Sequence, residues 1–229
     1  MYLNIKIKED FRTLKKDTEY KFDFTNRDRY LMVGPNGCGK STLINILRSF
    51  QCDNAGDSPR GSYQDKLGYT EISGMKDKAE IDTDFEKFYF ISSEFDDPLS
   101  LDNMATAEAA IRNGGFYWKR KSNGERQLQN LGKWVQENQD NWNEKCLLVL
   151  DEADKGFDLK YQVGLHNMLA NIPVKNNVKF LVVSHTLIPI LLEDEVYAFK
   201  YRVMLSPSTY IGLETGYDIK ISKDERTEV

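Results

Sequence analysis

The sequence predicts an α/β fold in which strands and helices alternate around a largely parallel sheet. Three observations support this prediction. Short apolar runs with the length of buried strands recur along the chain. Segments with the apolar period of amphipathic helices separate several of these runs. Glycine or polar residues directly follow three of the runs, at 34, 151 and 184–185, and open parallel sheets bind their ligands at such strand ends.

The composition is that of a chain able to bury a core, and we expect a single domain over residues 1–229. The chain has 229 residues, of which 40% are hydrophobic and 29% are charged. Its net charge of −5 (31 − 36) excludes a general basic field that would attract nucleic acid. Binding of nucleic acid remains possible only through a local patch such as residues 119–121.

Cysteine usage and hydropathy indicate in which cellular compartment the protein is expected. The three cysteines, Cys38, Cys52 and Cys146, are odd in number and widely spaced, which favours reduced thiols over a disulfide frame or a zinc site. The N-terminal residues lack the apolar core of a signal peptide. No apolar run approaches the ~18 residues that span a bilayer. We therefore expect a cytoplasmic protein without membrane insertion.

The first part of the chain predicts strands of two kinds. Residues 2–8 and 20–24 alternate between apolar and polar side chains, as half-buried strands do. Residues 30–33 are continuously apolar and are expected to form a fully buried strand. Residues 41–50 then carry apolar side chains at helical spacing. A strand, a glycine-rich turn and a helix are therefore expected to follow one another.

The rest of the chain continues this alternation. Residues 51–61 are rich in Gly, Pro, Asp and Ser and predict a surface loop, and the charged segment 220–229 predicts a frayed tail. Further strands are expected at 66–72, 79–84, 88–91, 146–150, 178–183, 196–199 and 204–205. Further helices are expected at 101–112, from 122 onward, at 160–171 and at 188–192.

The glycine-rich turn between residues 34 and 42 carries the most specific motif. It reads Gly, four residues, Gly-Lys-Ser, a pattern whose backbone N–H groups and following helix N-terminus bind phosphate. Lys40 would reach the β- and γ-phosphates, and the Ser41 hydroxyl would bind Mg2+. A glycine-rich turn that binds nothing is the alternative, which the flanking strand and helix disfavour. The expected nucleotide-binding residues of this turn are Asn36, Gly37, Cys38, Gly39, Lys40, Ser41 and Thr42.

Two further strand ends carry candidate catalytic groups in addition to Lys40. Asp151 would help to hold Mg2+ through water. The adjacent Glu152 could polarise the water that attacks the γ-phosphate, although an acidic pair at a strand end can also be an ordinary cap. His185 is expected to contact the γ-phosphate, and a purely structural histidine is the alternative. Lys40, Glu152 and His185 are thus the expected catalytic residues.

In these motifs the chain resembles the ATP-binding-cassette (ABC) ATPases along nearly its whole length. The phosphate loop, the Ser-Asn-Gly-Glu-Arg-Gln segment at 122–127, the Asp151-Glu152 pair and the Ser184-His185 pair come in the family order. The resemblance implies a P-loop NTPase fold with a mainly parallel sheet core, an antiparallel β subdomain and a short helical lobe at about 96–142. It also implies ATP and Mg2+ as ligands.

The same resemblance implies an ATP-dependent homodimer. In this family two subunits enclose two ATP molecules, each lying between one phosphate loop and the signature segment of the other subunit. Ser122 and Gly124 belong to the segment that is similar to this signature, and they would contact the nucleotide across the interface. A serine hydroxyl and free N–H groups at a helix start suit an anion. Residues 157–158 resemble the loop that crosses the dimer interface.

Within the family, the N-terminal part resembles the SMC, RecF and OLD-like ATPases. This resemblance rests on residues 5–14 and 34–37, and it makes Arg12 a candidate nucleotide contact. The segment at 122–127 is similar to that of small stand-alone ATPases of bacterial and phage conflict systems. We therefore expect a soluble, head-only ATPase that hydrolyses MgATP within a dimer. It would drive or gate a separate protein effector, in DNA maintenance or in such a conflict system.

Departures from the family pattern leave two alternatives open. Residues 92–94 stand where the family has a glutamine, Asn123 and Lys121 differ from the signature, and the segment 94–122 is short. The chain could instead be the nucleotide-binding subunit of an ABC transporter, although the short segment and the Arg12 region argue against this. It could also be an ATP-gated clamp or scaffold with little turnover, which the missing glutamine allows.

Overall fold

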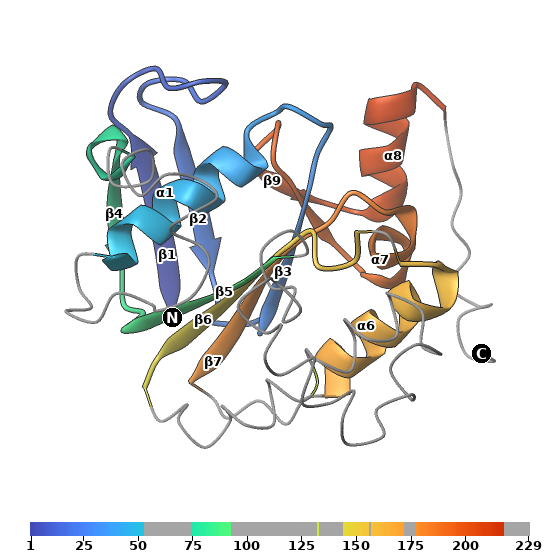
Figure 1. The fold of residues 1–229 in the computed structure, drawn as a ribbon. Helices are drawn as coiled ribbons and strands as arrows, with labels where there is room; N and C mark the ends of the chain where they lie inside the picture. Colours follow the sequence, from blue (N-terminus) through green and yellow to red (C-terminus); the bar gives the residue numbers. More distant parts are fainter. Residues whose placement is uncertain (53–74, 93–131, 133–143, 156, 172–176, 218–229) are drawn as a thin grey trace, which may run out of the picture.

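A six-stranded sheet forms the centre of the fold (Figure 1). The structure is a computed structural model, and it describes residues 1–52, 75–92, 132, 144–155, 157–171 and 177–217. The first five strands of the sheet are parallel, and only its last edge strand is antiparallel to its neighbour. In spatial order the strands are β5 (Lys87–Ser92), β6 (Cys146–Asp151), β7 (Val178–Val183), β3 (Arg29–Val33), β8 (Val196–Ala198) and β9 (Val203–Leu205).

A second sheet has three antiparallel strands in the order β2-β1-β4. These are β1 (Tyr2–Ile7), β2 (Glu19–Asp23) and β4 (Ala79–Thr83), the last following a short 3-10 helix at Lys76–Lys78. In β1 and β2 buried and more exposed side chains alternate, as expected for strands with one face on a core. The predicted antiparallel subdomain is confirmed.

Helices cover both faces of the central sheet. Helix α1 (Lys40–Cys52) lies between the two sheets, whereas α6 (Leu159–Asn171) and α7 (Leu187–Leu192) pack on the opposite face (Figure 1). Alternate residues of β6 therefore join different cores. Leu147 and Val149 pack with α1 and the antiparallel sheet, while Leu148 and Leu150 pack with α6 and α7.

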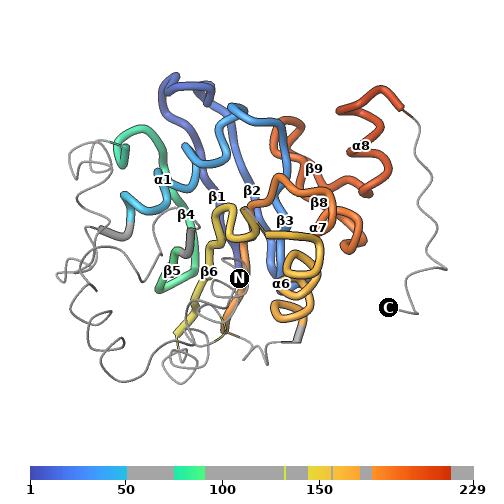
Figure 2. Tube along the Cα trace, turned by 45° about the vertical axis from the view of Figure 1, so that its right-hand side comes forward, coloured from blue at the N-terminus to red at the C-terminus, as the bar shows by residue number. Residues whose placement is uncertain are grey.

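The strand register brings three strand ends together. Strand β7 lies between β3 and β6, and its last residue, Val183, pairs with Met32 on one side and with Asp151 on the other. The segments that follow these strands therefore leave the sheet side by side. Figure 2 shows the continuations of β3 and β6 at the same edge of the sheet. This is the edge at which the sequence places its candidate site residues.

Strands and helices follow the sequence-based expectation closely where the structure describes the chain. Helix α8 (Pro207–Thr215) was not predicted, although its signals are present. Ser206 caps it by accepting the Thr209 N–H, Pro207 stands at its start, and Gly216 ends it at φ 75°. Several predicted segments lie outside the described residues. They are the strand at 66–72, the helices at 101–112 and from 122, the lobe at 96–142, residues 53–61 of the predicted loop, and the tail at 220–229.

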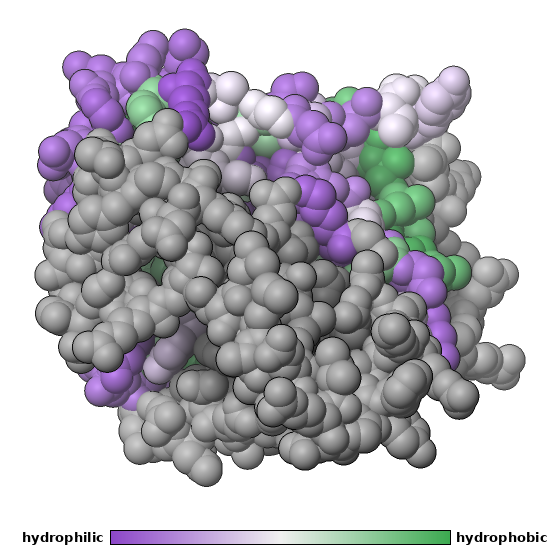
Figure 3. Space-filling view, viewed as in Figure 1, coloured by the Kyte–Doolittle hydropathy of each residue, from purple (hydrophilic) through white to green (hydrophobic). Residues whose placement is uncertain are grey.

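The described surface is mostly hydrophilic in the view of Figure 3. Apolar surface gathers there over the side of the molecule that carries α7 and α8. The large apolar side chains exposed on these two helices are Leu187 and Leu213. Within the described ranges, none of the helices is long and apolar enough to cross a lipid bilayer.

Candidate functional site

The phosphate loop connects β3 to α1 and depends on two glycines in left-handed backbone conformations. Gly37 has φ 76° and Gly39 has φ 112°, values that side-chain-bearing residues rarely adopt. A Cβ atom on Gly39 would also lie 2.6 Å from the Thr13 hydroxyl oxygen and 2.8 Å from a Leu14 methyl carbon. The loop can therefore hold this shape only with glycine at position 39.

The turn that presses on Gly39 is the one that carries Arg12. Phe11 and Leu14 close it with two backbone hydrogen bonds of 2.9 and 3.0 Å, and Leu14 is buried. Arg12 sits at φ 54° with its side chain exposed and its guanidinium 5.5 Å from the centre of the Phe11 ring. The structure thus places Arg12 in a turn that packs on the phosphate loop, and its contact with a nucleotide stays a prediction.

Lys40 begins α1 and folds back into the loop. Its ammonium donates to the carbonyl oxygens of Gly34 at 2.7 Å and Pro35 at 3.0 Å, and the residue is 3% exposed. Burial lowers the pKa of Lys40, while the nearby Cys38, Glu152 and Asp151 side chains act in the opposite direction. The ammonium is therefore within electrostatic range of the Asp151 carboxylate at the end of β6 and of the Glu152 carboxylate that follows it.

The other predicted residues of the loop differ in exposure. Asn36 and Gly37 are exposed, Cys38 is half-buried, and Thr42 is buried. Ser41 is exposed at the start of α1. Backbone N–H groups at a helix start have no partner within the helix and attract anions. The exposed residues of the loop and this helix start are therefore available to a phosphate.

Asp151 and Glu152 lie at the end of β6, as predicted, but in different surroundings. Asp151 is the last residue of the strand and is buried. Glu152 turns the chain at φ 52°, and its N–H donates to the Val183 carbonyl at 3.0 Å. Its side-chain oxygens contact His185 Nε2 at 2.8 Å and Lys155 Nζ at 3.3 Å.

His185 is partly exposed and points at Glu152. Burial lowers its pKa first, the Lys40 ammonium lowers it further, and the Glu152 carboxylate opposes both. The imidazole is therefore neutral near pH 7. Because a carboxylate only accepts hydrogen bonds, the neutral ring carries its proton on Nε2 and leaves Nδ1 as an acceptor. The contact with Glu152 is then a hydrogen bond from an uncharged histidine.

Two polar residues that the sequence analysis did not single out belong to the same turn. Lys155 contacts Glu152, and Asp154, which is buried, accepts hydrogen bonds from Ser184 and Thr186. The signal in the sequence is their position, since Asp154 and Lys155 come two and three residues after Glu152. The hydrogen-bond partners of Asp154, Ser184 and Thr186, are 30 and 32 residues away and could not be predicted from its position.

The candidate ligands of Mg2+ fit that ion. An exposed hydroxyl at the start of α1, from Ser41, and the Asp151 carboxylate at the end of β6 supply oxygen atoms, and Mg2+ binds through few protein oxygens together with phosphate and water. Among the described residues, no group of three or more His, Cys, Asp or Glu side chains could hold a metal. Ser122 and Gly124 lie outside the described residues, so their expected role stays a prediction.

A family model settles the class of the protein. The model described as ABC transporter matches residues 18–155, which include the phosphate loop, Asp151 and Glu152. The chain belongs to the ABC transporter family. It has the P-loop fold of that family, as the sequence predicted.

Individual ABC proteins show a more distant similarity. The zinc import ATP-binding protein ZnuC of Vibrio parahaemolyticus is 27% identical over 180 residues, which cover 77% of this chain and 64% of that protein. The spermidine/putrescine import ATP-binding protein PotA of Pseudomonas aeruginosa is 22% identical over 192 residues, covering 76% of this chain and 48% of PotA. The chain thus matches less than two thirds of the length of these relatives.

Solved ABC structures agree on the fold. A metal-chelate type ABC transporter in an inward-facing conformation superposes with a TM-score of 0.53 at 15% identity, covering 92% of this chain and 87% of that chain. An ATP-bound bacterial Atm1-family ABC exporter gives a TM-score of 0.50 at 13% identity, covering 93% of this chain and 40% of that chain. These relatives and structures are transport proteins, and they give no support to the SMC, RecF and OLD-like branch.

Proposed function

We propose that this chain is the ATP-hydrolysing subunit of an ABC system, with Glu152 as the general base and His185 as its partner. The contact of 2.8 Å between Glu152 and His185 supports this assignment. It lies at the edge where the phosphate loop and the end of β6 meet. A candidate base must lie within hydrogen-bonding reach of the groups it serves, and both residues are exposed enough to reach a bound nucleotide.

Each residue would then have a separate task. Lys40 would exchange its hydrogen bonds to Gly34 and Pro35 for phosphate oxygens. Mg2+, held by Ser41 and through water by Asp151, would supply positive charge at the phosphates. Glu152 would take the proton of the attacking water.

His185 would place its Nε2 proton between Glu152 and the γ-phosphate. The reaction is phosphoryl transfer to water, in which positioning and charge neutralisation do most of the catalysis. A second subunit would complete the site with Ser122 and Gly124, and hydrolysis would then take place in an ATP-dependent dimer.

We infer further that the partner is the membrane component of an importer. The relatives ZnuC and PotA are import ATP-binding proteins, and their names favour this alternative over a soluble effector. In its described part the chain has no helix able to cross a bilayer.

A second candidate keeps the soluble reading. The turn that carries Arg12 packs directly on Gly39 of the phosphate loop, where an arginine could reach a nucleotide. This placement agrees with the resemblance of residues 5–14 to the SMC, RecF and OLD-like ATPases. The partner would then be a soluble effector, with nucleic acid as a further possible ligand.

One experiment separates the two candidates. A tagged Glu152→Gln chain, loaded with ATP, is used to recover partners from a detergent extract of membranes and from the soluble fraction of the source cells. Recovery of an integral membrane protein supports the importer, and recovery of a soluble protein or DNA supports the second candidate. The matched control is Lys40→Ala, which should bind ATP poorly and recover neither. Recovery that does not depend on ATP would contradict both.

A further inference from the structure

A buried carboxylate lies directly behind His185. Asp154 is only 3% exposed and belongs to the turn after β6. Its Oδ2 atom accepts a hydrogen bond from the Ser184 hydroxyl at 2.6 Å and another from the Thr186 hydroxyl. The Ser184 oxygen in turn accepts the Thr186 N–H at 3.1 Å. We call Asp154, Ser184 and Thr186 the Asp154 clasp.

The clasp holds both neighbours of His185 and leaves His185 itself free to face the site. Thr186 has an extended backbone, with φ −88° and ψ 148°, and successive side chains of an extended chain point to opposite sides. Ser184 and Thr186 accordingly face Asp154. His185, between them, faces the other way and contacts Glu152. The hydrogen bonds of its two neighbours to Asp154 therefore set the direction of the His185 ring.

The turn after β6 carries residues that contact both sides of the segment 184–186. Glu152 contacts His185 on one side, and Asp154 contacts Ser184 and Thr186 on the other. Glu152 and Asp154 are two positions apart, and the turn is anchored by the Glu152 N–H, which donates to Val183 at 3.0 Å. The outer contact, between Glu152 and His185, is about a quarter exposed (24% and 27% of the side chains). The inner contact is almost fully buried, with Ser184 at 1%, and hydrogen bonds to a carboxylate are stronger away from water.

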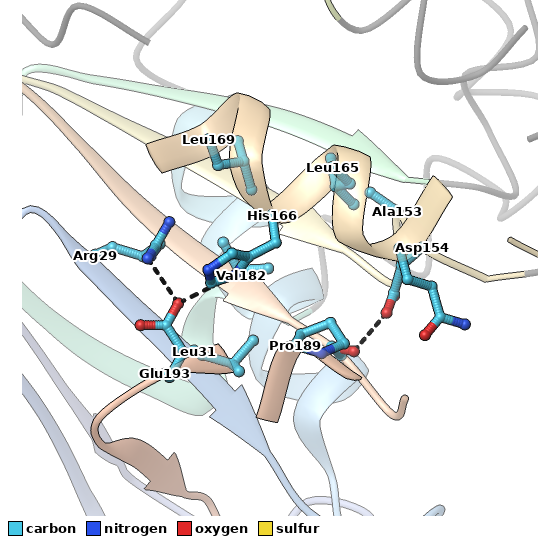
Figure 4. Close-up of a pocket in the computed structure, with 12 residues that line it drawn as sticks. Arg29, Leu31, Ala153, Asp154, Leu165, His166, Leu169, Val182, Pro189 and Glu193 are labelled. Atoms are coloured by element: carbon cyan, nitrogen blue, oxygen red, sulfur yellow. Dashed lines mark hydrogen bonds and ion pairs between the residues drawn. The ribbon is translucent and has the colours of Figure 1, made fainter. Parts of the chain in front are cut away.

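Figure 4 shows what lies on the far side of the clasp. Asp154 stands at the edge of a cavity of about 20 Å³, room for about one water molecule. The cavity is lined by residues of α6 and α7 and by the start of β3. Asp154 and Ser184 thus border this cavity, and the Asp154 carboxylate holds the segment after β7 through its hydrogen bonds to Ser184 and Thr186.

We propose that Asp154 is a positioning residue for ATP hydrolysis, acting through Ser184 and Thr186 to aim His185 at Glu152. The inference rests on the role proposed above for His185. A carboxylate that only stabilised the fold would affect the stability of the protein, and the ring of His185 in the folded molecule would keep its surroundings. The two roles therefore differ in a property of His185 that can be measured directly.

The first measurement uses the histidine ring signals. The chain has two histidines, so NMR of protein with isotope-labelled histidine gives two ring signals, and His185→Ala identifies which belongs to His185. Thr186→Val removes one hydroxyl with little change of shape, and Thr186→Ser keeps it. Thr186→Val should shift or broaden the His185 signal and leave that of His166 in place, whereas Thr186→Ser should resemble the wild type.

The second measurement is a double-mutant cycle on turnover. Thr186→Val should lower the turnover number on the order of tenfold, as a slightly misplaced group does, and leave the half-saturating ATP concentration unchanged. In a His185→Ala background the same substitution should cost nothing more, because both changes remove one function. Thr186→Ser should restore turnover.

Some results would overturn the proposal. An unmoved His185 signal in folded Thr186→Val, or an equal further loss of turnover in the His185→Ala background, would make the clasp a structural feature alone. If Thr186→Val does not fold, Ser184→Ala removes the other hydroxyl and is judged in the same way. The ring signals do not depend on hydrolysis. Normal turnover of Glu152→Gln would therefore refute the proposed function and still leave the clasp open to this test.

Discussion

The molecule contains two groups made of the same three kinds of residue, and they lie on opposite sides of the Asp154 clasp. One is the open trio, Lys40, Glu152 and His185. The other is the closed trio, Arg29, Glu193 and His166, which lines the cavity in Figure 4. Each combines a cation, a glutamate and a histidine. Their different surroundings show why only one of them is suited to chemistry.

In the closed trio the partners are fixed. Arg29 begins β3 and binds the Glu193 carboxylate at the end of α7 at 2.8 Å. His166 Nδ1 lies 3.7 Å from the same carboxylate oxygen. Burial lowers the pKa of His166 to about 4, with help from the Arg29 charge, so the ring is neutral near pH 7 and this contact is no ion pair. Burial also raises the pKa of Glu193, which the Arg29 charge opposes.

In the open trio the partners can be exchanged. Lys40 donates to loop carbonyls, and the Glu152 carboxylate accepts from the exposed Lys155 ammonium at 3.3 Å. Exposed ion pairs contribute little to stability. The contact between Glu152 and Lys155 can therefore be given up at low cost. The comparison indicates that the greater exposure of Glu152 and His185, and not the residue types, makes the open trio a candidate for catalysis.

The largest expected effect comes from neutralising the two glutamates in turn. Glu152→Gln keeps the shape of the side chain and cannot take a proton, so turnover should fall by at least about 100-fold while ATP still binds. Glu193→Gln is the matched change in the closed trio. It should lower the thermal midpoint and leave the turnover of the folded protein near that of the wild type. Steady-state phosphate release and a nucleotide titration measure both.

The contrast between the open and the closed trio would be contradicted if the outcomes for Glu152→Gln and Glu193→Gln were exchanged. Wild-type turnover in Glu152→Gln would remove this residue from the role of base. A large loss of turnover in folded Glu193→Gln would mean that the closed trio takes part in the reaction.

The open trio could be predicted from the sequence because local signals place it. Lys40 belongs to a motif of fixed spacing, and Glu152 and His185 follow uninterrupted apolar runs. Runs of this kind predict buried strands, and a parallel sheet brings their ends together. The register in which Val183 pairs with both Met32 and Asp151 brings these strand ends side by side.

The closed trio and the clasp could not be predicted in the same way. Arg29 and Glu193 are 164 positions apart in the sequence. The proposed role of Asp154 depends on the hydroxyls of Ser184 and Thr186, which follow a different strand. Such contacts depend on how α6 and α7 pack on the sheet, which no local pattern encodes. The roles of Ser122 and Gly124 depend on a second subunit, and they remain predictions.

A smaller effect should separate the two histidines by their response to pH. His166 has a pKa of about 4 in the folded protein and an ordinary value near 6.5 when unfolded. Between these values the unfolded chain takes up a proton and the folded one does not, so stability falls as the pH is lowered. At about pH 5 this penalty is up to about 2 kcal/mol relative to about pH 7.5.

His166→Asn has no titrating ring and lacks this penalty. The stability difference between wild type and variant, measured by denaturant unfolding, should therefore shift in favour of the variant between about pH 7.5 and about pH 5. The titration of Glu193 is shared by both proteins and largely cancels. His185→Asn is the control from the open trio, and its shift should be smaller because that ring is more exposed (27% against 14%). Equal shifts would contradict the contrast in burial.

The smallest expected effect concerns two cysteines that repeat the same contrast. Cys38 is half-buried in the phosphate loop, with its sulfur 3.6 Å from Lys40 Nζ. Cys146 is fully buried in β6, and burial raises the pKa of its thiol, which makes it unreactive. A maleimide should therefore label Cys38 in the empty protein, and Cys38→Ser gives the background from the other thiols.

A bound nucleotide should cover Cys38. With MgATP at about ten times its dissociation constant, the free protein is reduced by about tenfold, and the labelling rate should fall by the same factor. The experiment is best carried out on Glu152→Gln, so that ATP is not consumed. Lys40→Ala should lose the protection because it should bind ATP weakly. If MgATP leaves the labelling rate of Cys38 unchanged although a titration shows that the nucleotide is bound, the phosphate loop does not hold the nucleotide beside Cys38, and the open trio loses its assigned substrate.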